Sequence, residues 1–169
     1  MQHLTLYYIL WMYIPNVFRR IRKEIIYLLL RHYIPNRITG TYPQLQGCIE
    51  NLKIGNNVCF NPRVYIHLGD IPYQSIVDIG NNCVFSRDVR IISTTMMPSS
   101  FINRDFNHTQ SSIIIGDNVW IGDSSLILQN VHISSNVVIA AGSIVTKDLL
   151  DEKCLYGGIP AKKIKELTI

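Results

Sequence analysis

Apolar residues return every six positions along most of this chain. Twelve positions carry an aliphatic residue or phenylalanine at this interval: Ile54, Phe60 and Ile66; Ile79, Phe85 and Ile91; and Ile115, Ile121, Ile127, Ile133, Ile139 and Val145. With 47% hydrophobic residues, such a series arises by chance on the order of once in ten thousand sequences. A second series of small or apolar residues follows four positions later in most units, and Gly, Asn and Asp fill the turns between them.

A period of six fits neither an α-helix nor simple β alternation. A chain that turns a corner every six residues places all of these side chains on one inner axis. Three hexads then form one coil of a triangular prism, which is a parallel β-helix with three sheets and a core of stacked Ile, Val and Phe. Backbone hydrogen bonds run between coils, so both ends of the stack need covering. We assign residues 46–150 to this mainly β domain.

The hexad register breaks twice. The interval between Ile66 and Ile79 is thirteen residues, which predicts a small bulge around residues 69–74. A polar segment at residues 93–112 separates Ile91 from Ile115 and predicts an extended loop. A long loop leaving a rigid scaffold is a common place for functional residues.

The two ends of the chain differ from the repeat. Residues 1–45 contain two apolar stretches, 4–14 and 25–30, which we interpret as short helices, each too short to cross a bilayer. They either cap the prism or rest on an anionic membrane surface, because residues 1–40 hold six basic residues and one acidic residue. The C-terminal residues 151–169 contain GGIP followed by AKKIKEL, which predicts a turn and a short basic helix.

Composition narrows the class of protein. The formal net charge of +4 is concentrated at the N-terminus, and we expect no nucleic-acid partner. The four cysteines show no CxxC or CxxH spacing, so the sequence predicts neither a zinc knuckle nor a disulfide scaffold. We therefore expect a cytoplasmic protein with reduced thiols, with a possible site of action at the inner face of the membrane.

From Leu52 to Ile164 the sequence resembles the hexapeptide-repeat acyltransferases, and among them the galactoside, maltose and surface-polysaccharide O-acetyltransferases. The most specific part is IGDNVWIGDSSLILQNVHISSNVVIAAGSIVTKD followed by GGIPAKKIK. The resemblance implies a left-handed β-helix and a homotrimer whose active sites lie between neighbouring subunits. It also implies acetyl-CoA as the acetyl donor, no metal, and a sugar or glycan hydroxyl as the acceptor.

Transfer to a sugar hydroxyl needs a general base, and histidine has a suitable pKa. His108 lies in the extended loop and is the best placed candidate; His67 beside an inward position is a second, while His132 falls in a predicted turn. The resembling enzymes carry their catalytic histidine near the start of the loop, where this chain has Met96 and Met97. Three alternatives remain: His108 is the base, another histidine such as His67 is the base, or the base has been lost.

Other candidate site residues follow from the same resemblance. Asn61, Asp88 and Trp120 match acceptor-side positions, and either Asp88 or Asp105 would orient the imidazole. Ala141, Gly142 and Ser143 match the stretch that lines the pantetheine channel. The positions that match the nucleotide end of the groove are Thr146, Lys147, Lys162, Lys163 and Lys165, and their charge suits a polyanionic coenzyme.

The sequence therefore predicts an acetyl-CoA-dependent O-acetyltransferase that acts on a sugar of a surface polysaccharide or its precursor. Two alternatives stay open. One is a catalytically impaired, CoA-binding trimeric scaffold, which the Met96 and Met97 pair motivates. The other is a serine acetyltransferase, for which a larger helical N-terminal domain is expected.

Overall fold

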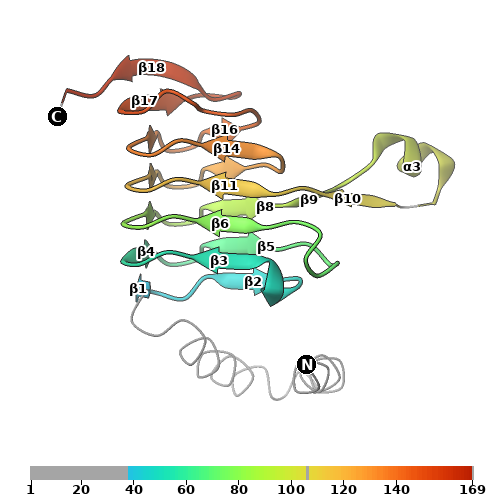
Figure 1. Cartoon of the computed structure of the whole chain (residues 1–169). Helices are drawn as coiled ribbons and strands as arrows, with labels where there is room; N and C mark the ends of the chain where they lie inside the picture. The colour runs from blue at the N-terminus through green and yellow to red at the C-terminus, as the bar shows by residue number, and fades with distance from the viewer. Residues whose placement is uncertain (1–37, 106, 169) are drawn as a thin grey trace. The chain divides into compact units, whose positions relative to one another are not determined.

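The computed structural model describes residues 38–105 and 107–168, which form a parallel β-helix built from stacked coils (Figure 1). Each complete coil contributes one strand to each of three walls. Face A contains β1 (Ile38–Gly40), β4 (Val58–Phe60), β7 (Val84–Phe85), β12 (Trp120–Ile121), β15 (Val138–Ile139), β17 (Cys154–Gly157) and β18 (Lys162–Glu166). Face B contains β2 (Gln44–Gln46), β5 (Tyr65–His67), β8 (Arg90–Ile92), β13 (Leu126–Ile127) and β16 (Ile144–Val145). Face C contains β3 (Leu52–Ile54), β6 (Val77–Ile79), β11 (Ile113–Ile115) and β14 (Val131–Ile133).

The core is the stack that the hexad pattern predicts. All twelve residues of the first series are buried, and the most exposed of them, Ile54, has an exposed fraction of 8%. The second series is buried as well: Val58, Val64, Cys83, Val89, Val119, Ser125, Val131, Val137 and Ser143. The rings of Phe60 and Phe85 stack with their centroids 4.8 Å apart. Burying one such aliphatic or aromatic side chain contributes about 1.5–3 kcal/mol, so the repeat itself supplies the main stabilisation of the fold.

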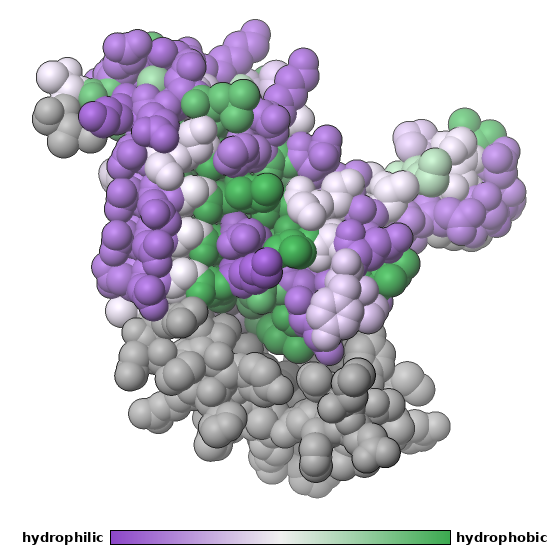
Figure 2. Space-filling model, in the orientation of Figure 1, coloured by the Kyte–Doolittle hydropathy of each residue, from purple (hydrophilic) through white to green (hydrophobic). Residues whose placement is uncertain are grey.

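Asparagine side chains line the corner between faces C and A. Asn57, Asn82, Asn118 and Asn136 have φ angles between +55° and +60°, the left-handed region that asparagine tolerates well. Each of the first three donates its side-chain N–H to the oxygen of the next, at 3.0, 3.1 and 3.0 Å. Figure 2 shows this corner as a polar stripe along one edge of the prism. The recurring IGNN and IGDN sequences therefore specify a turn and a ladder between coils.

The other two corners carry most of the candidate site residues. The A–B corner consists of residues 61–64, 86–89, 122–125 and 140–143. The B–C corner consists of residues 47–51, 68–76, 93–112, 128–130 and 146–148. At this second corner the extended loop leaves the prism as a hairpin of β9 (Thr94–Met96) and β10 (His108–Gln110), with helix α3 (Pro98–Asn103) toward its tip (Figure 1). The 3-10 helix η2 (Ile49–Asn51) lies at the same corner of the first coil.

Four expectations require correction or restriction. The predicted C-terminal helix is the antiparallel strand β18, which pairs with β17, because the exposed edge of face A offers main-chain partners to this segment. The β-helix begins before residue 46, since β1 pairs with β4 and β2 pairs with β5. His132 lies in strand β14 and not in a turn. The helices predicted in the N-terminal segment fall outside the described residues.

The described residues contain neither a candidate membrane-spanning helix nor a candidate metal site. In these residues no helix combines the length and apolarity that crossing a bilayer demands. Within the same ranges, no group of three or more His, Cys, Asp or Glu side chains is placed to hold a metal ion.

Candidate functional site

Five of the residues predicted for substrate and coenzyme lie on the A–B corner. Asn61 and Asp88 lie in the second and third coils, and Ala141, Gly142 and Ser143 lie in the fifth. Backbone hydrogen bonds stack these coils: Asn61 N–H donates to Phe85 O at 2.9 Å, and Gly142 N–H donates to Asp123 O at 2.8 Å. Residues far apart in sequence therefore form one continuous edge along the prism axis.

A pocket of about 430 Å³ opens beside this edge. Its floor is made by small residues at successive coils, namely Ser86, Gly122, Ala140 and Ala141, and its wall comes from residues that point outward from face A: Trp120, Val138 and Leu155. A Cβ at Gly122 would lie 2.5 Å from the Ala141 nitrogen, so glycine is what allows coils four and five to approach here. The pocket therefore combines an apolar wall with exposed backbone.

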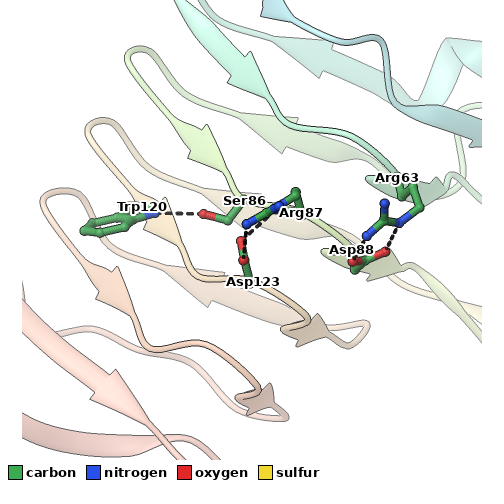
Figure 3. A network of polar contacts seen from close by, with 6 residues as sticks. All are labelled: Arg63, Ser86, Arg87, Asp88, Trp120 and Asp123. Atoms are coloured by element: carbon green, nitrogen blue, oxygen red, sulfur yellow. Dashed lines mark hydrogen bonds and ion pairs between the residues drawn. The ribbon is translucent and has the colours of Figure 1, made fainter.

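Trp120 is fixed at the rim of this pocket. Its indole N–H donates to the Ser86 hydroxyl at 3.0 Å, and its side chain keeps 53% exposure (Figure 3). Ser86 itself is buried, so the hydrogen bond anchors the polar end of the ring and leaves the apolar face open. Trp120 therefore presents one face of its ring beside the pocket.

Two ion pairs follow the same corner (Figure 3). Arg63 donates from Nε and Nη2 to the two carboxylate oxygens of Asp88 at 2.6 and 2.5 Å. Arg87 lies 3.6 Å from the Asp123 carboxylate in the next coil. The hydrogen bond from Arg63, more than any other interaction, lowers the pKa of Asp88, which therefore stays ionised. Asp88 is thus held as a carboxylate paired with the Arg63 guanidinium.

At residues 140–143 the backbone, and not the Ser143 side chain, is what faces the corner. The Ser143 side chain is buried and its hydroxyl donates to Ala140 O at 2.5 Å, so only its backbone faces the corner. Ala140 N–H donates to Tyr156 O, and Gly142 N–H donates to Asp123 O. Among the described residues no backbone acceptor pairs with the N–H of Ala141, and Ala141 lines the pocket.

His108 lies on the B–C corner, away from the residues above. It is exposed on strand β10 and is paired across the hairpin with Met96. Asp105 is also exposed in this loop, whereas Asp88 belongs to the A–B corner. Within one chain the candidate base and the candidate acceptor residues therefore lie at different corners of the prism.

His67 also lies at the B–C corner, but its ring is engaged. Its Nδ1 accepts the Gly69 N–H at 3.2 Å and lies 3.4 Å from the Thr94 hydroxyl at the base of the hairpin. The third histidine, His132, is exposed on face C. Position and exposure favour His108 among these three side chains.

The candidate phosphate-binding residues do not form one cluster. Thr146 and Lys147 are exposed at the B–C corner of the fifth coil, and Lys162 and Lys165 are exposed on strand β18. Lys163 is held by the Asp151 and Glu166 carboxylates at 3.4 and 3.1 Å. Lys147, Lys162 and Lys165 are consequently better placed to meet an anion than Lys163.

Of the residues that line the pocket, sequence reasoning named Trp120 and Ala141 as site residues and missed the others, among them Ser86, Gly122, Ala140 and Leu155. Ser86, Gly122 and Ala140 occupy the same position within the hexad repeat. Each follows directly after an inward residue, Phe85, Ile121 or Ile139, and each is small. Small residues at that one phase of the repeat mark the corner where a ligand is able to approach the backbone.

Comparison with known proteins agrees with this architecture. The family model described as bacterial transferase hexapeptide (six repeats) matches residues 112–147. The chain is 33% identical over 165 residues to a galactoside O-acetyltransferase of Escherichia coli (strain K12), covering 89% of this chain and 80% of the relative. A maltose O-acetyltransferase from Clostridium difficile 630 superimposes with a TM-score of 0.68 at 26% identity, covering 80% of this chain and 68% of that one.

A third similar protein is a galactoside acetyltransferase solved in complex with coenzyme A. It superimposes with a TM-score of 0.54 at 26% identity, covering 83% of this chain and 68% of that one. The predicted left-handed parallel β-helix is thereby confirmed as the fold of the described residues. By sequence and by fold, the chain belongs to the hexapeptide-repeat acetyltransferases, the family that includes the galactoside O-acetyltransferases.

Proposed function

We propose that this protein transfers the acetyl group of acetyl-CoA to a hydroxyl of a sugar, in a surface polysaccharide or its precursor. The observation that carries the proposal is the pocket on the A–B corner, where small residues expose backbone beside an apolar wall. A pantetheine arm is long, narrow and largely apolar, with amide groups that pair with backbone. The relatives named above are galactoside and maltose O-acetyltransferases, which supports a sugar acceptor.

The coenzyme would lie along the A–B corner of the upper coils. Ala141 N–H would donate to a pantetheine carbonyl, while Gly142 leaves room for the arm. Lys147, Lys162 and Lys165 would attract the phosphates, because all three are exposed cations at the end of the prism where the repeat finishes. Trp120 would cover the arm from the side of face A.

The chemical step requires removal of one proton. His108 would accept the proton of the sugar hydroxyl as that oxygen forms a bond to the carbonyl carbon of the thioester. The tetrahedral intermediate carries its negative charge on the former carbonyl oxygen, which backbone N–H groups would stabilise. Its collapse breaks the carbon–sulfur bond, and the protonated His108 returns its proton to the CoA thiolate. The products are the O-acetyl sugar and free CoA.

A homotrimer would complete the site. His108 lies at the B–C corner of one chain, whereas Asn61 and Asp88 lie at its A–B corner and Trp120 lies on face A, so a second copy is needed to bring them together. Face A presents an outward apolar column of Val84, Trp120, Val138 and Leu155, which are paired in register across neighbouring strands. A column of this kind suits contact with another copy.

The test is an acetyl-transfer assay of the full chain with acetyl-CoA and a panel of galactosides, maltose and glycan precursors. His108→Ala is expected to lower kcat by ~10²- to 10⁴-fold and to leave CoA affinity nearly unchanged. His132→Ala, on exposed face C, serves as the matched control. An unaffected rate for His108→Ala would remove this residue from the mechanism. CoA binding by the wild type without any acetyl transfer would instead favour a scaffold.

A further inference from the structure

The bulge between β5 and β6 presents two large apolar side chains to solvent. Ile71 is 54% exposed and Tyr73 is 79% exposed. Tyr73 also has a φ angle of +61°, in the left-handed region that bulky residues rarely adopt. Glycine or asparagine would fill this position with less strain. Residues held in such a conformation cluster at functional sites, so the exposed ring calls for a functional explanation.

A buried asparagine fixes the conformation of the bulge. Asn51 is fully buried, and its side-chain nitrogen donates to Leu68 O at 2.8 Å and to Ile71 O at 2.9 Å. Its side-chain oxygen accepts the Tyr73 N–H at 2.7 Å. The backbone of Tyr73 is thus tied to the first coil, and the ring is presented from an anchored position.

The bulge is also tied to the hairpin that carries His108. The Gln110 side-chain oxygen accepts the N–H groups of Asp70 and Ile71 at 3.0 and 3.2 Å. Its side-chain nitrogen donates to Ile71 O at 2.8 Å. Figure 1 shows the loop after β5 and the hairpin leaving the prism at the same corner. Gln110 therefore fixes the spacing between these two projecting segments.

Strand geometry places His108 on the side of the hairpin that faces the bulge. Side chains two residues apart on a strand point to the same side, so His108 shares a side with Gln110. Thr94, paired with Gln110, lies on that side too and contacts His67 of the second coil. On the opposite side, the Thr109 hydroxyl lies 3.4 Å from the side-chain amide of Gln129 in the fourth coil. The imidazole is therefore directed toward the coil that carries Tyr73.

We propose that Tyr73, supported by Ile71, is a stacking surface for the pyranose ring of the acceptor, on the side of the hairpin that carries His108. One face of a pyranose consists of C–H groups and packs well on an aromatic ring. Stacking in this way leaves the hydroxyl edge of the sugar free to meet the imidazole. The inference rests on the proposed function, because it assigns the acceptor side of the same site.

The test compares Tyr73→Asn with Tyr73→Phe in the full-length protein. Asparagine accepts the left-handed backbone and removes the ring, whereas phenylalanine keeps the ring. With methyl β-galactoside or maltose as acceptor, Tyr73→Asn is expected to raise the acceptor KM about 5- to 30-fold while kcat and the acetyl-CoA KM stay near wild type. Tyr73→Phe is expected to remain within about twofold of wild type.

Two results would overturn the inference while leaving the acetyltransferase proposal standing. One is an unchanged acceptor KM in Tyr73→Asn. The other is a change in oligomeric state on size-exclusion chromatography, which would assign the ring to contact between copies. Leu150→Ala, at a side chain 61% exposed on another part of the prism, is the control for loss of an exposed apolar group. Failure of the wild type to acetylate any sugar would overturn the proposed function itself.

Discussion

The Nδ1 atom of His67 accepts the backbone N–H of Gly69 at a distance of 3.2 Å. In a neutral imidazole only one nitrogen has a free lone pair, so this contact places the ring proton on Nε2. The lone pair that a general base needs is therefore already occupied. Among the histidines of the B–C corner, this leaves His108 as the side chain able to accept a proton from a substrate.

Substitution of His67 by asparagine should consequently have little effect on catalysis. The asparagine oxygen takes the place of Nδ1 as acceptor for the Gly69 N–H and preserves the base of the bulge. We expect kcat to stay within about fivefold of wild type in steady-state assays. His67→Phe, which lacks the acceptor, should impair the acceptor KM more than Asn does. A hundredfold fall in kcat for His67→Asn would mean that His67 is the base.

The two glycines of the A–B corner should differ in their tolerance of alanine. A Cβ at Gly122 would lie 2.5 Å from Ala141 N and 2.8 Å from Ile139 O, so the coils would have to separate. A Cβ at Gly142 meets nothing within 4 Å, and only its φ of +70° opposes the change. In urea unfolding, we expect Gly142→Ala to cost about 1 kcal/mol and Gly122→Ala about 1–3 kcal/mol or the loss of folding. Equal losses would argue against the close approach of these coils.

Charge at the end of the prism should govern affinity for the coenzyme. Replacing Lys147 and Lys165 together by methionine removes two exposed cations and keeps the length of both side chains. We expect the acetyl-CoA KM to rise about 5- to 50-fold and to depend less on salt concentration. Lys53→Met, on the outward side of strand β3, is the control for removal of an exposed lysine away from this end of the prism. An unchanged KM would place the phosphates elsewhere.

The buried thiol of Cys83 should make stability depend on alkaline pH. Burial is the main reason that the pKa of Cys83 is raised from 9.0 to about 11. Because the folded pKa is the higher one, this contribution to stability is complete below pH 9 and is lost as the pH rises to 11. Serine already occupies the equivalent inward position at Ser125 and Ser143, so Cys83→Ser is the reference.

Measured by urea unfolding between pH 8 and 11, the wild type should lose up to ~2–3 kcal/mol more than Cys83→Ser. Parallel pH profiles for the two proteins would contradict the assignment of this effect to the thiol.

The fold was predictable because every sixth side chain points into the core of the prism. Ile121, Ile127 and Ile133 point inward whatever surrounds them, so the period survives in the sequence. The first coil was harder to predict, since Gln44 and Gln46 flank a single inward leucine and no hexad precedes them. The C-terminal strand was missed because AKKIKEL contains good helix formers. The segment is extended in the structure because it pairs with the free edge of β17.

Within the regular repeat, the sequence indicated candidate site residues through the family resemblance, which names Ala141 and Gly142. Ala141 and Gly142 occupy a fixed phase of the hexads, and the pocket lies beside them. The contacts of Gln110, Asn51 and Tyr73 were not predictable, because they join segments 17 to 40 residues apart through irregular loops. The same holds for Arg63 and Asp88, whose pairing depends on stacking between coils.

The lysine-rich strand β18 has a consequence for how separate molecules behave. Any β-helix whose last coil ended on a bare parallel strand would offer that strand to the first coil of another molecule. Here the chain reverses, and its outermost strand is exposed along its whole length and carries Lys162, Lys163, Lys165 and Glu166. Densely charged edges disfavour pairing between molecules. The last edge of face A is thus a poor partner for the first coil of another prism.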